Sequence, residues 1–219
     1  MPQGADWAVH WAIRDPARPP ISALVDDRGR FGSAMVRDGF RFFLSPRARA
    51  EIDAQFAAFA ATGPALDHVN THKHFHLHPT VLSLILRVGS HYGLRAFRLP
   101  HEPGGQVGLW PWAALTRARL ERAGVGHNDQ ARGIAHSGRF DEAALIDVLT
   151  LLPRGLTEIY LHPATAGPEP ITDTMRGYRH ADELSALLSP RVREAFAETG
   201  AGTGGFTDLC DNLKQRATT

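Results

Sequence analysis

The sequence predicts an α/β fold in which mostly parallel strands alternate with covering helices. Short apolar segments that are typical of buried strands alternate along the chain with longer segments whose apolar residues recur at helical spacing. Glycine or proline stands at several of the boundaries between them. Such alternation is typical of a parallel sheet with helices on its faces, and 219 residues suffice for one core. We therefore expect a single domain over residues 1–219.

The expected strands are short apolar runs, and two of them stop at a proline. The run Leu94–Leu99 is closed by Pro100, and Leu156–Leu161 leads directly into His162-Pro163. The full set comprises residues 5–13, 66–70, 94–99, 131–135, 156–161 and 203–206.

The expected helices are marked by residues that start or stop helices. Pro79 suits the first turn of a helix, whereas Gly93 and Gly124 each follow a helical pattern and end it. Long polar segments rich in proline and glycine are expected to be loops, over residues 14–33 and 164–179. The helices are expected over residues 34–44, 46–61, 79–91, 110–123, 141–151, 180–188 and 190–198.

The overall composition excludes several classes of protein. A formal net charge of +1 provides no general attraction to nucleic acid. No apolar run is long enough for a transmembrane segment, and the N-terminus lacks the basic and apolar regions of a signal peptide. Because Cys210 is the single cysteine, no internal disulfide can form, and we expect a cytoplasmic protein.

The histidines are concentrated in one segment. Of 12 histidines, five fall between positions 68 and 78. His72, His74, His76 and His78 are spaced by two, so on an extended strand their side chains would point to one face. Imidazole is a common ligand of zinc and similar metals, and catalytic sites take about three protein ligands, so some of these histidines would serve other roles. The alternative is a polar strand exit with solvated histidines, but we favour a divalent-metal site.

The segment His72-Lys-His-Phe-His-Leu-His-Pro79 resembles the signature of the YdjC-like carbohydrate deacetylases. The resemblance is strongest to the branch that is associated with hopanoid biosynthesis (HpnK-like), and it extends over nearly the whole chain. Its supporting segments are residues 68–79, 92–100, 133–138 and 152–164.

The resemblance implies a distorted (β/α) barrel and one divalent metal ion, Mg²⁺ or Zn²⁺. In the family an aspartate and two histidines hold the metal. His10 in Ala8-Val-His-Trp11 and His72 match the two histidine positions.

The resemblance also implies roles for other polar residues. His162 matches a family His-Pro motif at the end of a strand, where it would act as the general acid; a structural histidine that ends the strand is the alternative. The remaining candidates would bind substrate or support the residues that do: His74, His76, Asn70 and Arg98.

One part of the family pattern is missing from this sequence. The family begins with a strand that ends in Asn-Ala-Asp-Asp-Phe-Gly, and those aspartates supply the metal carboxylate and the base. No such motif occurs here, so we expect an incomplete barrel without its first βα unit. A late start codon or fragment and a natural short form are both open explanations.

The implied function is metal-dependent N-deacetylation of a sugar, with the N-acetylglucosamine headgroup of the hopanoid lipid bacteriohopanetetrol as substrate. The alternative is a non-catalytic metal-binding remnant. A metal-dependent hydrolase of another class is less favoured, because no second carboxylate-rich motif appears. The expected partner is a small-molecule or glycolipid substrate at the inner face of the membrane, with peripheral lipid contact and a homodimer left open.

Overall fold

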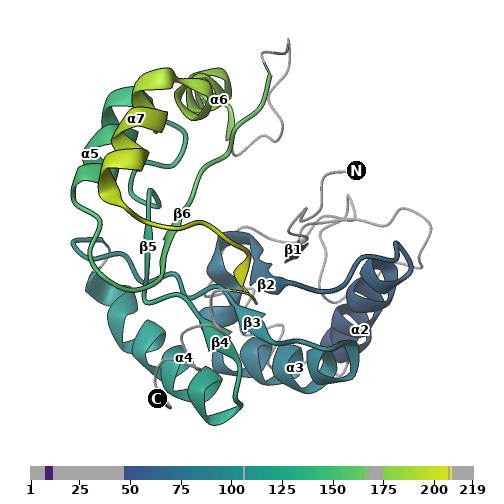
Figure 1. Cartoon of the computed structure of the whole chain (residues 1–219). Coiled ribbons are helices and arrows are strands. Elements are labelled where there is room, and N and C mark those ends of the chain that lie inside the picture. Colours follow the sequence, from purple (N-terminus) through teal and green to yellow (C-terminus); the bar gives the residue numbers. More distant parts are fainter. Residues whose placement is uncertain are drawn as a thin grey trace. The chain divides into compact units, whose positions relative to one another are not determined.

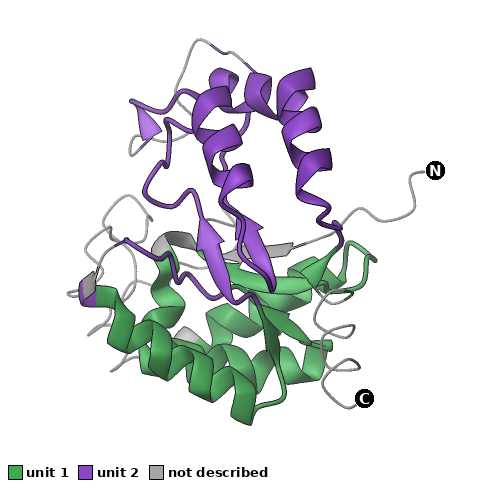
Figure 2. Cartoon of the chain, turned by 60° about the vertical axis from the view of Figure 1, so that its left-hand side comes forward, with its two compact units in different colours: residues 1–98, 109–127, 205–219 green, residues 99–108, 128–204 purple. Residues whose placement is uncertain are grey.

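The computed structural model describes residues 8–11, 47–105, 107–165, 167, 175–206 and 208. For residues 8–11, 47, 48, 72, 73 and 107 it describes the backbone alone. The chain divides into two compact units (Figure 2). Unit 1 comprises Met1–Arg98, Leu109–His127 and Gly205–Thr219, and unit 2 comprises Leu99–Gly108 and Asn128–Gly204.

Unit 1 is built on a parallel sheet of four strands in the order β1-β2-β3-β4 (Figure 1). The strands are β1 (Ala8–Trp11), β2 (His68–Thr71), β3 (Ala96–Phe97) and β4 (Gly126–His127). Because all four run in the same direction, their carboxyl ends lie at one edge of the sheet, where parallel α/β proteins place their chemistry.

The helices of unit 1 begin and end where the sequence predicts. They are α2 (Arg47–Ala60), α3 (Pro79–Gly89) and α4 (Trp110–Arg122), with the short 3₁₀ turns η1 (His72–Leu77) and η2 (Ser90–Tyr92). A further 3₁₀ turn, η3 (Val107–Leu109), begins in the unit 2 segment and ends at the first residue of the next unit 1 segment. Pro79 occupies the first turn of α3, and Gly93 follows η2 with a left-handed φ of 79°.

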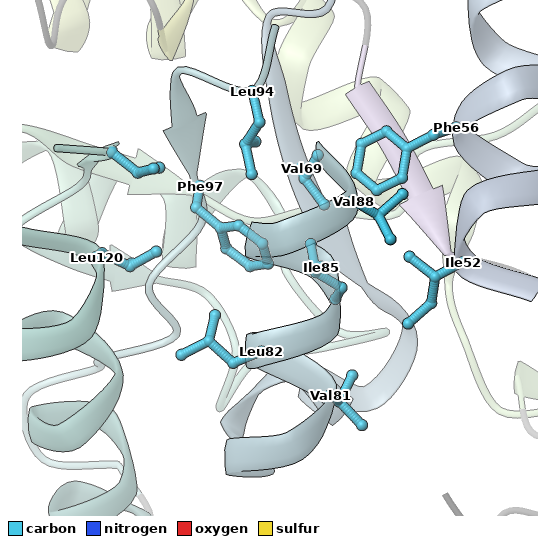
Figure 3. Packing of buried hydrophobic residues seen from close by; sticks show 11 residues of the cluster. Ile52, Phe56, Val69, Val81, Leu82, Ile85, Val88, Leu94, Phe97 and Leu120 are labelled. Carbon is cyan, nitrogen blue, oxygen red and sulfur yellow. The ribbon is translucent and has the colours of Figure 1, made fainter. Parts of the chain in front are cut away.

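The core of unit 1 forms where α2, α3 and α4 cover the strands. Side chains from the three helices converge on Val69 of β2 and Phe97 of β3 (Figure 3). Phe97, Val81 and Leu120 are completely buried, and each such side chain contributes roughly 1.5–3 kcal/mol. This packing fixes β2, which leads directly into the histidine segment, and its neighbour β3.

Unit 2 contains a second parallel pair of strands and three helices. Its elements are β5 (Gln130–Arg132), β6 (Thr157–Ile159), α5 (Glu142–Thr150), α6 (His180–Leu188) and α7 (Pro190–Thr199). The side chain of Asp141 caps α5 by accepting from the Ala144 N–H at 3.1 Å. The core lies among the helices and is formed by Phe140, Leu145, Leu149, Ala186 and Val192.

The α/β class with parallel strands is confirmed, but three details differ from the expectation. Residues 203–205 form no strand, and β4 was not expected because two residues leave no periodic pattern. The described strands are hydrogen-bonded in two separate sheets, so they do not form a closed barrel. The helix expected over residues 34–44 and the loop expected over residues 14–33 both lie outside the described residues.

Within the described part of the chain, no helix combines the length and the apolar character that crossing a membrane requires.

Candidate functional site

The histidine segment is a tight turn and not the extended strand on which its four histidines would share one face. Strand β2 ends at Thr71, and residues 72–77 then form the 3₁₀ turn η1. The turn is held by the His76 N–H, which donates to the Thr71 hydroxyl oxygen at 3.0 Å, and by the His78 N–H, which donates to the Phe75 carbonyl at 3.0 Å. Because a 3₁₀ helix has three residues per turn, histidines spaced by two do not share one face.

His76 points into the protein and is completely buried. Its Nδ1 lies 2.7 Å from the Thr71 hydroxyl oxygen, and its ring meets the Phe97 ring edge-on at a centroid distance of 4.9 Å. Burial lowers the pKa of His76 well below 6.5, and the charges of His74 and Arg98 lower it further. His76 is therefore neutral at physiological pH and acts as an uncharged part of the site.

His74 has an unusual backbone conformation. Its φ is 56°, and it is the one non-glycine residue with positive φ among the described residues. The side chain is partly exposed, and its ring meets the His76 ring edge-on at a centroid distance of 6.1 Å. A strained residue that remains partly exposed at a strand exit is typical of a functional position.

Asn70 and Arg98 lie at the same sheet edge as the turn. Asn70 is the third residue of β2, is 4% exposed, and is the register partner of His10 in β1. Arg98 follows β3, and its N–H donates to the Val69 carbonyl at 3.0 Å. Since Arg98 also lowers the pKa of His76, its guanidinium lies close enough to act on the histidine segment.

The backbones of the two predicted metal ligands, His10 and His72, lie at this edge of the sheet. His10 is one residue before the end of β1, and His72 directly follows β2, its parallel neighbour. Their side chains lie outside the described part, so their role stays a prediction. Two imidazoles from adjacent strand ends suit a borderline divalent metal by chemistry. Among the residues that the structure describes, no group of three or more histidine, cysteine or acidic side chains is arranged to hold a metal ion.

His162 lies in unit 2, three residues beyond β6. Its Nε2 is 2.8 Å from the Tyr160 hydroxyl, and its ring meets the rings of Tyr160 and Tyr178 edge-on at centroid distances of 4.6 and 5.2 Å. Its backbone N–H donates to Glu183 Oε2 at 2.5 Å, and its carbonyl lies 2.6 Å from His180 Nδ1. His162 is thus held by contacts to both its imidazole ring and its backbone.

Sequence reasoning missed the residues that surround His162. Neither Glu183 nor His180 was among the candidate residues. The spacing of three between His180 and Glu183 puts both on one face of the expected helix 180–188, which was an available signal. Nothing local in the sequence connects that face to a strand end about twenty residues earlier.

The loop after β5 provides further polar contacts within unit 2. Both carboxylate oxygens of Glu102 accept backbone hydrogen bonds from it, from the N–H groups of Gly133 and Ala135 at 2.7 Å each. Gly138 closes the loop with a φ of 79°, and a Cβ there would collide with the ring of Tyr178. The glycines of the segment 133–138 are therefore required by the backbone and by close packing.

Comparisons with known proteins extend over most of the chain. Residues 2–198 match the protein family described as YdjC-like protein. The carbohydrate deacetylase of Homo sapiens is 31% identical over an alignment of 231 residues, which covers 89% of this chain and 70% of the human protein. The carbohydrate deacetylase of Mus musculus is 29% identical over 231 residues, and the alignment covers 89% of this chain and 73% of the mouse protein.

A solved structure has a similar fold. It is a protein of Enterococcus faecalis V583, named for cellobiose-phosphate cleavage, with a TM-score of 0.66 and 20% identity. The superposition covers 94% of this chain and 77% of that protein. At this identity the likeness concerns the fold alone.

Proposed function

Because this chain belongs to the YdjC-like protein family, we propose that it is a metal-dependent hydrolase that removes acetyl groups from an N-acetylated sugar. The observation that carries the proposal is the histidine turn at the carboxyl end of β2, beside the strand that contains His10. Its relatives in human and mouse are named carbohydrate deacetylases, which supports the reaction class.

His10 and His72 would hold one divalent metal ion, Mg²⁺ or Zn²⁺. When bound, such an ion makes a water molecule more acidic and polarises the amide carbonyl. The third ligand in the family is an aspartate of an Asn-Ala-Asp-Asp-Phe-Gly segment, which does not occur within these 219 residues.

The remaining residues would bind the sugar and move a proton. Hydrolysis forms a bond between the water oxygen and the acyl carbon, with the water proton passing to the base, which in the family is an aspartate of the Asn-Ala-Asp-Asp-Phe-Gly segment. The C–N bond breaks, and its electron pair stays on nitrogen. His162 as imidazolium would donate its proton to that nitrogen, releasing acetate and a free amine. His74 and Arg98 would hold sugar hydroxyl groups, while the buried His76 and Asn70 keep the strand end in place.

We propose that the sugar is the N-acetylglucosamine headgroup of a hopanoid lipid. The support is the resemblance of residues 92–100, 133–138 and 152–164 to the hopanoid-associated branch. A lipid-linked substrate would place the reaction at the inner face of the membrane, with peripheral contact to lipid.

The test measures acetate release by the metal-loaded protein. The substrates are N-acetylglucosaminyl bacteriohopanetetrol and a soluble N-acetylglucosamine disaccharide, each with Mg²⁺ or Zn²⁺. We expect faster release from the lipid-linked sugar, and a loss of about 100-fold or more in kcat for His162→Ala. Glu142→Gln is the matched control, since Glu142 pairs with Ser189 and Arg191 at the start of α7.

Three results would change the proposal. Equal or faster release from the soluble sugar would refute the lipid substrate and leave the deacetylase. No release from either substrate, with metal still bound, would favour the non-catalytic metal-binding alternative. Activity restored only when in-frame upstream codons are included would locate the missing carboxylate there.

A further inference from the structure

Helix α6 holds the backbone of His162 at both of its polar groups. The His162 N–H donates to Glu183 Oε2 at 2.5 Å, and the His162 carbonyl accepts from His180 Nδ1 at 2.6 Å. The next turn of the chain is tied to the same helix, because the Ala164 N–H donates to the His180 carbonyl at 3.2 Å. All of these residues belong to unit 2.

The hydrogen-bond chemistry assigns the protons in this cluster. A carbonyl oxygen can only accept, so His180 carries its proton on Nδ1. The His162 N–H can only donate, so the Oε2 atom of Glu183 is the acceptor. A glutamine at position 183 could accept from the same N–H without a titratable carboxyl group, so the backbone contact alone does not require a glutamate.

The cluster acts on His162 and does not reach a substrate. Glu183 is 0% exposed, and its Oε1 and the Nε2 of His180 are buried atoms without a hydrogen-bond partner among the described residues. Atoms that water cannot reach cannot bind a sugar directly. Any effect of Glu183 or His180 on chemistry must pass through His162.

We propose that Glu183 is a positioning residue that fixes His162 and stabilises its protonated imidazole. This inference rests on the proposed function, in which His162 donates a proton. Four titratable side chains contact His162: Tyr160, two residues before it, and Tyr178, from the loop before α6, meet its imidazole, whereas His180 and Glu183 from α6 bond to its backbone. Of these four groups, Glu183 is the one carboxyl group. A carboxylate near an imidazole favours the imidazolium, the form that a general acid requires.

The experiment compares Glu183→Gln with wild type and with Glu142→Gln. The glutamine keeps a hydrogen-bond acceptor and removes the charge, whereas Glu142 is a carboxylate of the same unit that contacts Ser189 and Arg191. The imidazole of His162 is followed by NMR over a pH titration, with its signal assigned by its loss in His162→Ala. Deacetylation of the sugar amide is measured on the same samples over the same pH range.

We expect Glu183→Gln to fold and to lower the titration midpoint of His162 by at least about 0.5 pH unit. Activity should then be lost at lower pH on the alkaline side, and kcat should fall about 10-fold with little change in KM. Glu142→Gln should match wild type. A folded Glu183→Gln with an unchanged midpoint and an unchanged pH profile would overturn the inference.

A second pair of variants tests the carbonyl contact. In His180→Asn the side-chain amide can replace the Nδ1–H donor, so the His162 signal should stay near its wild-type position, whereas His180→Ala should displace it. Equal displacement in both variants would contradict the role of this hydrogen bond. If wild type releases no acetate, the proposed function fails, but the NMR midpoint still decides whether Glu183 positions His162.

Discussion

The two histidine regions of this chain are held in different ways. In unit 1, His76 is fixed by Thr71, a partner five residues away, and by burial against Phe97. In unit 2, His162 is fixed by His180 and Glu183, which follow it by 18 and 21 residues. The first environment is apolar and keeps an imidazole neutral, whereas the second contains a buried carboxylate. One chain therefore fixes the same side chain in two ways, by burial and a nearby hydroxyl in unit 1 and by backbone hydrogen bonds from a packed helix in unit 2.

The largest expected effect concerns metal binding in unit 1. His72→Ala should abolish stoichiometric Zn²⁺ or Ni²⁺ binding in calorimetry, because it removes one of about three ligands. His78→Ala is the matched control within the same segment and should keep most of the binding, since His78 is the N-cap of α3. Equal loss in both variants would contradict the assignment of His72 as the ligand.

The next effect concerns the packing around His162 in unit 2. Gly138→Ala combines a left-handed φ of 79° with a collision between the new Cβ and the Tyr178 ring. We expect it to lower the free energy of unfolding by about 2 kcal/mol in urea denaturation. Gly177→Ala is the control, because a Cβ at that exposed position meets nothing within 4 Å. Similar losses in both would mean that Tyr178 is not held by this contact.

A smaller effect tests the local turn of unit 1. Thr71→Val keeps the shape of the side chain but removes the hydroxyl that bonds both the His76 ring and the His76 N–H. Leaving these buried groups unpaired should lower the free energy of unfolding by about 1–2 kcal/mol. Thr71→Ser restores the hydroxyl and should recover most of the loss. If serine performs no better than valine, the turn does not depend on these hydrogen bonds.

The difference between local contacts in unit 1 and contacts between distant residues in unit 2 bears on what could be predicted from the sequence. Helices α3, α4, α6 and α7 were predicted closely because proline and glycine mark their ends. The His162 strand end was visible as an apolar run before His-Pro. The shape of the histidine segment could not be predicted. Histidines spaced by two share one face only if the chain stays extended, whereas here the Thr71 hydroxyl holds the segment in a turn. Glu183 was missed because its contact with His162 arises from the packing of α6, which no local pattern reveals.

The last expected effect is a pH dependence that arises from the burial of His76. Burial lowers the pKa of His76 well below 6.5, and it lowers the pKa of His78 as well. Below pH 6.5 the unfolded chain therefore takes up protons that the folded chain does not, so stability is present above this pH and is lost as the pH falls. Each such histidine contributes a slope of up to about 1.4 kcal/mol per pH unit.

The stability test uses urea denaturation between pH 7.5 and 5, with a chelator present so that metal binding does not contribute. His76→Gln removes the titrating group, and its stability should depend on pH less steeply than that of wild type, although its overall stability is lower. His91→Gln changes an exposed histidine on η2 and should keep the wild-type slope. An unaltered slope in His76→Gln would mean that the buried imidazole is not the group that couples folding to acid, and the contrast between the two histidine regions would then rest on geometry alone.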